Sequence, residues 1–148
     1  MAEIIDGKAI SAKVRKEVAA EVESLQSCGI TPGLAVVLVG NNSASEIYVR
    51  SKEKACAEVG IRSVVHRLPV ETTQAELLAL IGRLNQDPAI HGILVQLPVP
   101  SQIDARAVQE AVSPDKDVDA FHPENVSRMV AGDPLFLPCT PAGGMELL

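Results

Sequence analysis

The chain has very few aromatic residues. Tyr48, Phe121 and Phe136 make up 2% of its 148 residues, and tryptophan is absent. Hydrophobic residues nevertheless account for 47% of the sequence, which argues against a disordered chain. The core must therefore be aliphatic, and a chain of this length is expected to form one domain with a substantial core.

Basic residues are also in short supply. The chain contains 13 lysines and arginines and 19 acidic residues, which gives a net charge of −6. No nucleic-acid partner is expected, because such partners require clustered basic residues that face phosphates. The longest apolar run, "LAVVLV" at 34–39, is too short to span a bilayer, so no membrane partner is expected either. The start "MAEIIDGKAI" lacks the apolar segment of a signal peptide, which predicts a cytoplasmic protein.

Several chemical motifs are missing. The three cysteines form no CxxC pair and are expected to be inert thiols, and the three histidines show no HExxH spacing. The run "DKDVDAFH" carries three aspartates, but Ala120 and Val126 stand where a calcium loop requires glycine and glutamate. No metal is expected.

Helical and strand patterns alternate through the first 112 residues. Apolar periodicity predicts helices at 8–27, 41–60, 72–87 and 103–112, and strands at 34–39, 61–70 and 90–100. Alternation of this kind is typical of a parallel sheet covered by helices. The sequence therefore predicts an α/β fold, a three-layer α-β-α domain with a mostly parallel sheet.

Local signals predict where two of these helices begin and end. Ser43 or Ser45 is expected to cap the second helix, and Gly60 to close it. Thr73 and Glu76 form a capping box at the start of the third.

The composition changes after Ser113. Residues 113–148 are polar, rich in Asp and Pro, and show little periodicity, which predicts an irregular segment that is functional or leads to another domain. Its last residues, "TPAGGMELL", resemble the first turns of a helix.

Tyr48 and Lys52 stand four residues apart, so they share one face of a helix. Spacing alone favours an uninvolved pair, a surface lysine beside a half-buried tyrosine. The Tyr-x-x-x-Lys pair of short-chain dehydrogenases is a poor match, because only 47 residues precede Tyr48 and the chain contains no GxGxxG or GxxxGxG.

Gln96 lies where a buried strand meets its exit loop. In parallel α/β sheets, ligands bind at the carboxyl ends of the strands, where the turn 39–42 and the start of the Tyr48 helix also lie. A buried amide without a partner costs about 1–3 kcal/mol. Gln96 therefore bonds either a neighbouring side chain or a ligand.

Four stretches together resemble one family, the bifunctional methylenetetrahydrofolate dehydrogenase/methenyltetrahydrofolate cyclohydrolases. They are "VGNNSASEIYVRSKEKACAEVGI", "QAELLALIGRLNQDPAIHGILVQLPV", "PDKDVDAFHPENV" and "PCTPAG", and the resemblance covers essentially the whole chain. It implies that Lys52 is the catalytic lysine, that Tyr48 stacks on the folate, and that Gln96 contacts and tunes the lysine. It also implies that Val95 and Leu97 flank the substrate and that Asp119 holds the pterin ring.

The resemblance implies NAD(P)-linked oxidation of 5,10-methylenetetrahydrofolate to the methenyl form and hydrolysis to 10-formyltetrahydrofolate. A lysine at its reference pKa of about 10.4 is a poor base at neutral pH, but burial and a cationic substrate would lower that pKa. Gln96 suits such a lysine because it adds no counter-charge. A carboxylate such as Asp119 can accept the adjacent N–H donors of a pterin.

The resemblance further implies that residues 1–148 are a catalytic domain, with 113–148 crossing toward an NADP-binding domain that the chain lacks. Dehydrogenase activity is therefore not expected of the chain alone, and the full-length protein is expected to be a homodimer. A folate-binding or interaction module without catalysis is the alternative, and a generic domain that precedes a Rossmann domain is a third reading. The family usually has glycine at Ala120 and Ser127, so a positive φ at either position would be strained.

Overall fold

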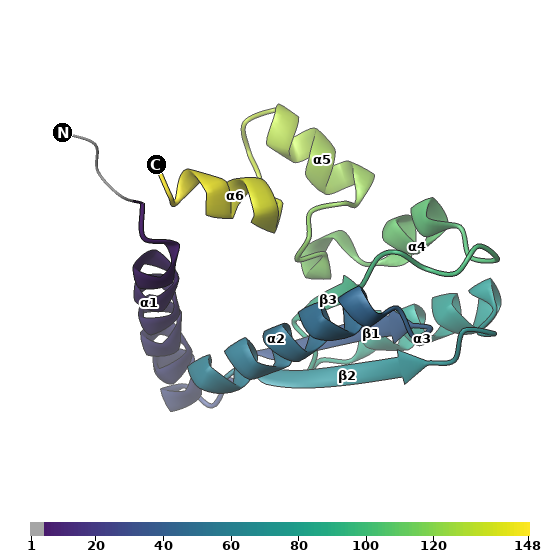
Figure 1. Cartoon of the computed structure of the whole chain (residues 1–148), viewed down its shortest axis with the longest axis horizontal. Helices are drawn as coiled ribbons and strands as arrows, with labels where there is room; N and C mark the ends of the chain where they lie inside the picture. Colours follow the sequence, from purple (N-terminus) through teal and green to yellow (C-terminus); the bar gives the residue numbers. More distant parts are fainter. Residues whose placement is uncertain (1–4) are drawn as a thin grey trace.

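A three-stranded parallel sheet flanked by helices forms the centre of the computed structural model, which describes residues 5–148 (Figure 1). Residues 1–4, the start of the stretch on which the signal-peptide expectation rests, lie outside the described part. The elements are α1 (Gly7–Ser27), β1 (Gly33–Val39), α2 (Ser43–Val59), β2 (Arg62–Leu68), α3 (Gln74–Gln86), β3 (Gly92–Val95), α4 (Ala105–Ala111), the 3₁₀ turn η1 (Pro114–Lys116), α5 (Pro123–Val130) and α6 (Cys139–Met145). None of the helices in the described part is long and apolar enough to cross a membrane.

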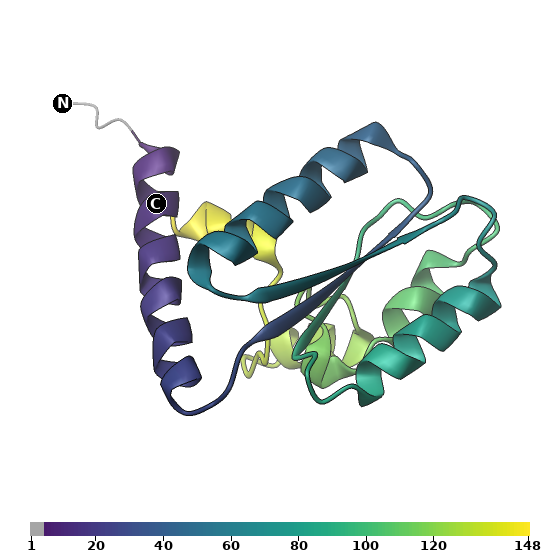
Figure 2. The same ribbon diagram turned by 90° about the horizontal axis from the view of Figure 1, so that it is seen from below.

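The strand order is β2-β1-β3, and both pairings are parallel. Strand β1 is central, and its residues 35–39 are at most 2% exposed. Its alternate side chains pack on opposite layers: Ala35, Val37 and Val39 join one apolar cluster, while Val36 and Leu38 join the other. The first cluster packs on α3 and α4 and the second on α2, which confirms the predicted α-β-α layers (Figure 2).

Two of the predicted helix signals are confirmed and one is wrong. Gly60 closes α2 at a φ of 82°, and Thr73 and Glu76 form the capping box of α3. The cap of α2, however, is Asn42 rather than Ser43 or Ser45, because its side chain accepts a hydrogen bond from Ser45 N at 3.0 Å. Asparagine is at least as good an N-cap as serine, so the helix begins at Ser43.

Strand β3 is shorter than the predicted 90–100 and ends at Val95. Pro98 and Pro100 follow, and proline has no N–H to donate to a sheet. The last contact along this edge is made by Gln96, whose backbone N donates to the Val37 carbonyl at 2.8 Å. The strand therefore ends just where its polar residue begins.

The segment after Ser113 is more regular than predicted, because it contains η1, α5 and α6. Helix α5 has only eight residues, too few for periodicity to reveal it, and it starts with Pro123 in its first turn and His122 as the cap. Helix α6 corresponds to the helical turns predicted near the end of the chain, although it begins at Cys139.

Ala120 has a φ of 55° and is the one non-glycine residue with a positive φ within residues 5–148. The expected strain is therefore found at Ala120, whereas Ser127 lies inside α5. Ala120 is also buried, at 1% exposure, so its methyl group contributes to packing.

Ala120→Gly should change the free energy of unfolding by less than about 0.5 kcal/mol. Glycine relieves roughly 1–2 kcal/mol of strain from the left-handed backbone, but it also makes the unfolded chain more flexible and removes a buried methyl group, and these effects offset one another. Ala79→Gly, at an exposed position inside α3, should instead cost about 1 kcal/mol. Urea unfolding of the two variants measures this contrast. A larger cost at Ala120 than at Ala79 would contradict the strain.

Candidate functional site

Helix α2 carries Tyr48 and Lys52 on one face. The Lys52 Nζ lies 5.8 Å from the centroid of the Tyr48 ring, while Tyr48 itself is 62% exposed. Lys52 is partly buried. The arrangement that spacing alone favours, a surface lysine beside a half-buried tyrosine, is therefore wrong for both residues. The exposed ring is free to offer a face to a ligand.

Gln96, directly after β3, is hydrogen-bonded to this lysine. Lys52 Nζ donates to Gln96 Oε1 at 3.1 Å, and Gln96 Nε2 donates to the Leu97 carbonyl at 2.9 Å. The second bond decides which end of the amide faces the amine. Of the two possibilities left open for Gln96, the structure shows a bond to a neighbouring side chain.

Asp119 lies in the loop that follows η1. Burial raises the pKa of its carboxyl group, the positive charge of Lys52 lowers that pKa, and the negative charge of Asp117 raises it further. The carboxylate is near enough to Lys52 to feel its field, but no hydrogen bond joins the two groups within the described residues. Its acceptor sites therefore remain available.

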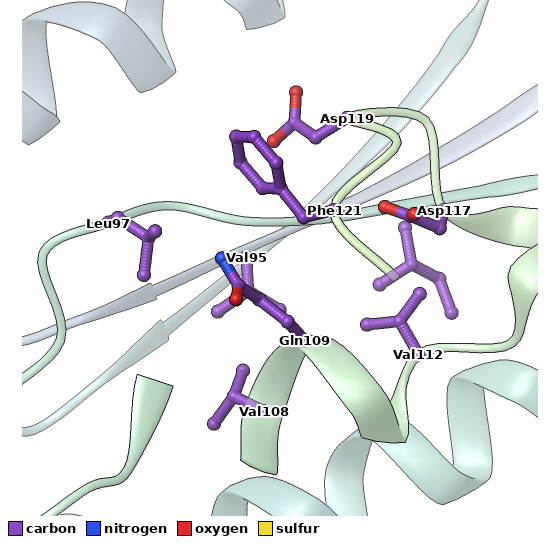
Figure 3. A pocket seen from close by; sticks show the side chains of 9 residues that line it. Val95, Leu97, Val108, Gln109, Val112, Asp117, Asp119 and Phe121 are labelled. Carbon is purple, nitrogen blue, oxygen red and sulfur yellow. The ribbon is translucent and has the colours of Figure 1, made fainter. Parts of the chain in front are cut away.

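A small cavity of about 20 Å³ lies beside Asp119 (Figure 3). Val95 and Leu97 line it, and the ring of Phe121 lies between Leu97 and Asp119 in the close-up. Its remaining walls are Ile93, Val108, Gln109, Val112 and Asp117. The cavity thus brings together three of the predicted site residues, Val95, Leu97 and Asp119, whereas Tyr48, Lys52 and Gln96 are not part of its wall.

Lys52 instead lines a larger, apolar hollow of about 410 Å³ on the α2 side of the sheet. The other walls come from Pro32, Gly33, Leu34, Ala55, Cys56, Ile61, His91, Gly92, Leu94, Val118 and Cys139. Burial raises the pKa of the Cys139 thiol, Asp119 raises it further, and Lys52 lowers it. Lys52 therefore acts electrostatically on groups near both hollows.

The lining residues that were not predicted as site residues include Gln109, Phe121 and Cys139. Phe121 is one of three aromatics and stands two places after Asp119, which is a signal that could have found it. Gln109 lies on α4 and carries no comparable signal.

Residues 5–148 do not contain the usual ligand groups for a metal ion or for a dinucleotide phosphate. Within residues 5–148, no three His, Cys, Asp or Glu side chains are grouped so that they could hold a metal ion. The turn after β1 has one glycine, Gly40, where a dinucleotide phosphate is normally bound by several. The 39–42 turn therefore lacks the several glycines of a usual dinucleotide phosphate loop.

Polar groups beside a parallel sheet and next to apolar hollows are typical of a small-molecule site in an α/β domain. A family model described as tetrahydrofolate dehydrogenase/cyclohydrolase, catalytic domain, matches residues 5–119. The chain belongs to this family.

Relatives and solved structures agree with this assignment. The bifunctional protein FolD of Geotalea uraniireducens (strain Rf4) is 63% identical over 100% of this chain and 53% of its own length. The FolD methylenetetrahydrofolate dehydrogenase/cyclohydrolase of Campylobacter jejuni superposes with a TM-score of 0.96 at 52% identity, over 99% of this chain and 52% of that one. The Trypanosoma brucei enzyme, solved with NADP cofactor and an inhibitor, has a TM-score of 0.94 at 39% identity, over 99% and 51%. The chain spans about half the length of the relatives it matches.

Asp119→Asn should stabilise the chain at neutral pH. Because burial raises the pKa of Asp119 above its ordinary 3.8, its contribution to stability is complete below pH 3.8 and is lost as the pH rises through the raised value. The variant should therefore melt at a higher temperature than the wild type at about pH 7, and the gain should shrink toward about pH 4.

Thermal unfolding followed by circular dichroism between these pH values measures the effect. Asp115→Asn, which removes an exposed carboxylate from η1, is the matched control and should change the melting temperature little at any pH. A gain for Asp119→Asn that grows in acid would contradict the assignment.

Proposed function

We propose that this chain is the folate-binding catalytic domain of an enzyme that oxidises 5,10-methylenetetrahydrofolate to 5,10-methenyltetrahydrofolate with NADP and hydrolyses that product to 10-formyltetrahydrofolate. Membership of the family supports the reaction class. The observation that carries the proposal is the hydrogen bond between Lys52 and Gln96 at the carboxyl edge of the sheet.

Lys52 is the proposed proton carrier of the hydrolysis. Water attacks the cationic amidinium carbon of methenyltetrahydrofolate, and the adduct then needs a proton moved from oxygen to nitrogen. A well-positioned amine can take the proton from the oxygen and then give it to the nitrogen. This requires that the hydrogen-bond partner of the amine does not stabilise its charged form. Gln96 meets this requirement because its amide oxygen orients Lys52 without adding a negative charge.

Tyr48 and Asp119 are the proposed contacts to the substrate. The exposed ring of Tyr48 offers a stacking surface one helical turn from Lys52. The Asp119 carboxylate, with free acceptor sites beside the apolar Val95 and Leu97, suits the adjacent N–H donors and flat ring of a pterin.

We infer that 1–148 is one catalytic domain and that 113–148 crosses toward an NADP-binding domain outside this chain. NADP, bound there, would accept the hydride. The relatives' greater length and the single glycine of the 39–42 turn support this division. The apolar hollow beside Lys52 is a surface that a second wall of the folate cleft could cover. We further propose that the full-length protein is a cytoplasmic homodimer whose product serves one-carbon metabolism and purine biosynthesis.

Lys52→Met should lower the cyclohydrolase rate of the chain by about 100-fold or more, because general acid–base catalysis typically contributes that much. Lys54→Met is a matched control, since Lys54 is an exposed lysine on the same helix with a 3.9 Å ion pair to Glu58. It should stay within about twofold of the wild type. The rate is followed as the loss of methenyltetrahydrofolate absorbance above the buffer rate.

Equal rates for the wild type and Lys52→Met would refute catalysis by this lysine. If the same samples then bound folate tightly, the chain would be a folate-binding module without catalysis. We expect no NADP reduction by the chain alone.

A further inference from the structure

Two buried polar side chains meet next to the loop that carries Asp119. Asp117 is 5% exposed, and Asn125, on α5, is 0% exposed. Asn125 Nδ2 donates to Asp117 Oδ2 at 3.0 Å and to the Pro114 carbonyl at 2.9 Å. The Asn125 Oδ1 has no partner within the described residues, so these two donated bonds alone orient the amide.

The Asp117 carboxylate in turn closes the loop on which Asp119 lies. Its Oδ2 also accepts a hydrogen bond from His122 N at 2.8 Å, and the Asp117 carbonyl accepts one from Ala120 N at 3.2 Å. Asp119 sits inside this ring of contacts, one residue before the left-handed Ala120. The direction of the Asp119 side chain therefore depends on how Asp117 is held.

The start of the loop has separate anchors. Lys116 Nζ donates to the carbonyls of Leu84 at 3.1 Å and Asp87 at 2.9 Å at the end of α3. Gly92 lets the next turn approach β3, because a Cβ at that position would lie 2.6 Å from Val118 Cγ1. The Asp117 backbone also pairs with Ile93 of β3 through an isolated parallel bridge. The backbone of Asp117 is therefore fixed on the sheet, while its side chain is held by Asn125 and by His122 N.

Burying a carboxylate and an amide is a poor way to gain stability, because apolar residues of similar volume are often as good or better. The pair does fix the orientation of the Asp117 side chain, because both groups form hydrogen bonds of defined geometry. Asp119 needs this, because its own carboxylate accepts no hydrogen bond from residues 5–148 that would orient it. Two parallel hydrogen bonds to a ligand are sensitive to such orientation.

We propose that Asn125 is a positioning residue for folate binding, and that by holding Asp117 it sets the direction in which Asp119 meets the pterin ring. This inference rests on the proposed function. Asn125 touches no substrate itself and acts through Asp117 and the loop 117–122.

A double-mutant cycle on the full 148-residue chain tests the proposal. Isothermal titration calorimetry gives the Kd of 5-formyltetrahydrofolate for the wild type, Asn125→Ala, Asp119→Ala and the double variant. Asn125→Ala should raise the Kd about tenfold when Asp119 is present, the effect of losing one well-oriented bond to a charged group. It should raise the Kd less than about twofold when Asp119 is already alanine, since residues that act as one unit are not additive.

Two further variants separate positioning from general loss of stability. Thr72→Ala removes another buried hydrogen bond, from Thr72 Oγ1 to the Pro69 carbonyl at 2.7 Å, and should leave the Kd unchanged. Asn125→Ser keeps a donor and should bind with intermediate affinity. It also replaces Asn125→Ala in the cycle if that variant does not fold.

The outcomes are distinct. The same increase in Kd in both Asp119 backgrounds, or no increase in either, would overturn the positioning role while leaving the proposed function intact. No binding of 5-formyltetrahydrofolate by the wild type would overturn the proposed function and this inference with it.

Discussion

Strand β1 lies between two parallel neighbours and beneath helices on both faces, so the side chains of residues 35–39 are shielded from water. A strand in this position can hold only apolar side chains, because an unpaired polar group there would be costly. The chemistry of the domain is therefore displaced to the carboxyl ends of the strands. Gln96 follows β3 directly, and α2, which carries Lys52, starts at the end of β1.

Lys52 and Asp119 do not form a direct ion pair with each other. Lys52 is hydrogen-bonded to a neutral amide, while Asp119 lies within reach of its field but not of its hydrogen bonds. In a partly buried setting, where water screens less, each charge remains strong and unneutralised by contact.

Long periodic segments were predictable from the sequence, and short ones were not. The layers, the parallel sheet and the capping box at Thr73 followed from patterns that extend over many residues or contain a specific pair. Helix α5 was not predicted because two helical turns are too short to show an apolar period. Asn42 was not predicted as the cap of α2 because Ser43 and Ser45, close by, are equally suitable residue types. Prolines shortened β3 by removing the donors that a strand needs.

The sequence by itself determined the fold class and, through its motifs, the family and the candidate residues Tyr48, Lys52, Gln96 and Asp119. Only the tertiary structure decided that Lys52 is partly buried while Tyr48 is exposed, and that Gln96 turns its oxygen toward an amine 44 residues away. It alone brought Asn125 against Asp117. The reason is physical: periodicity records which face of an element is buried, whereas the meeting of distant side chains depends on strand register and on how loops close.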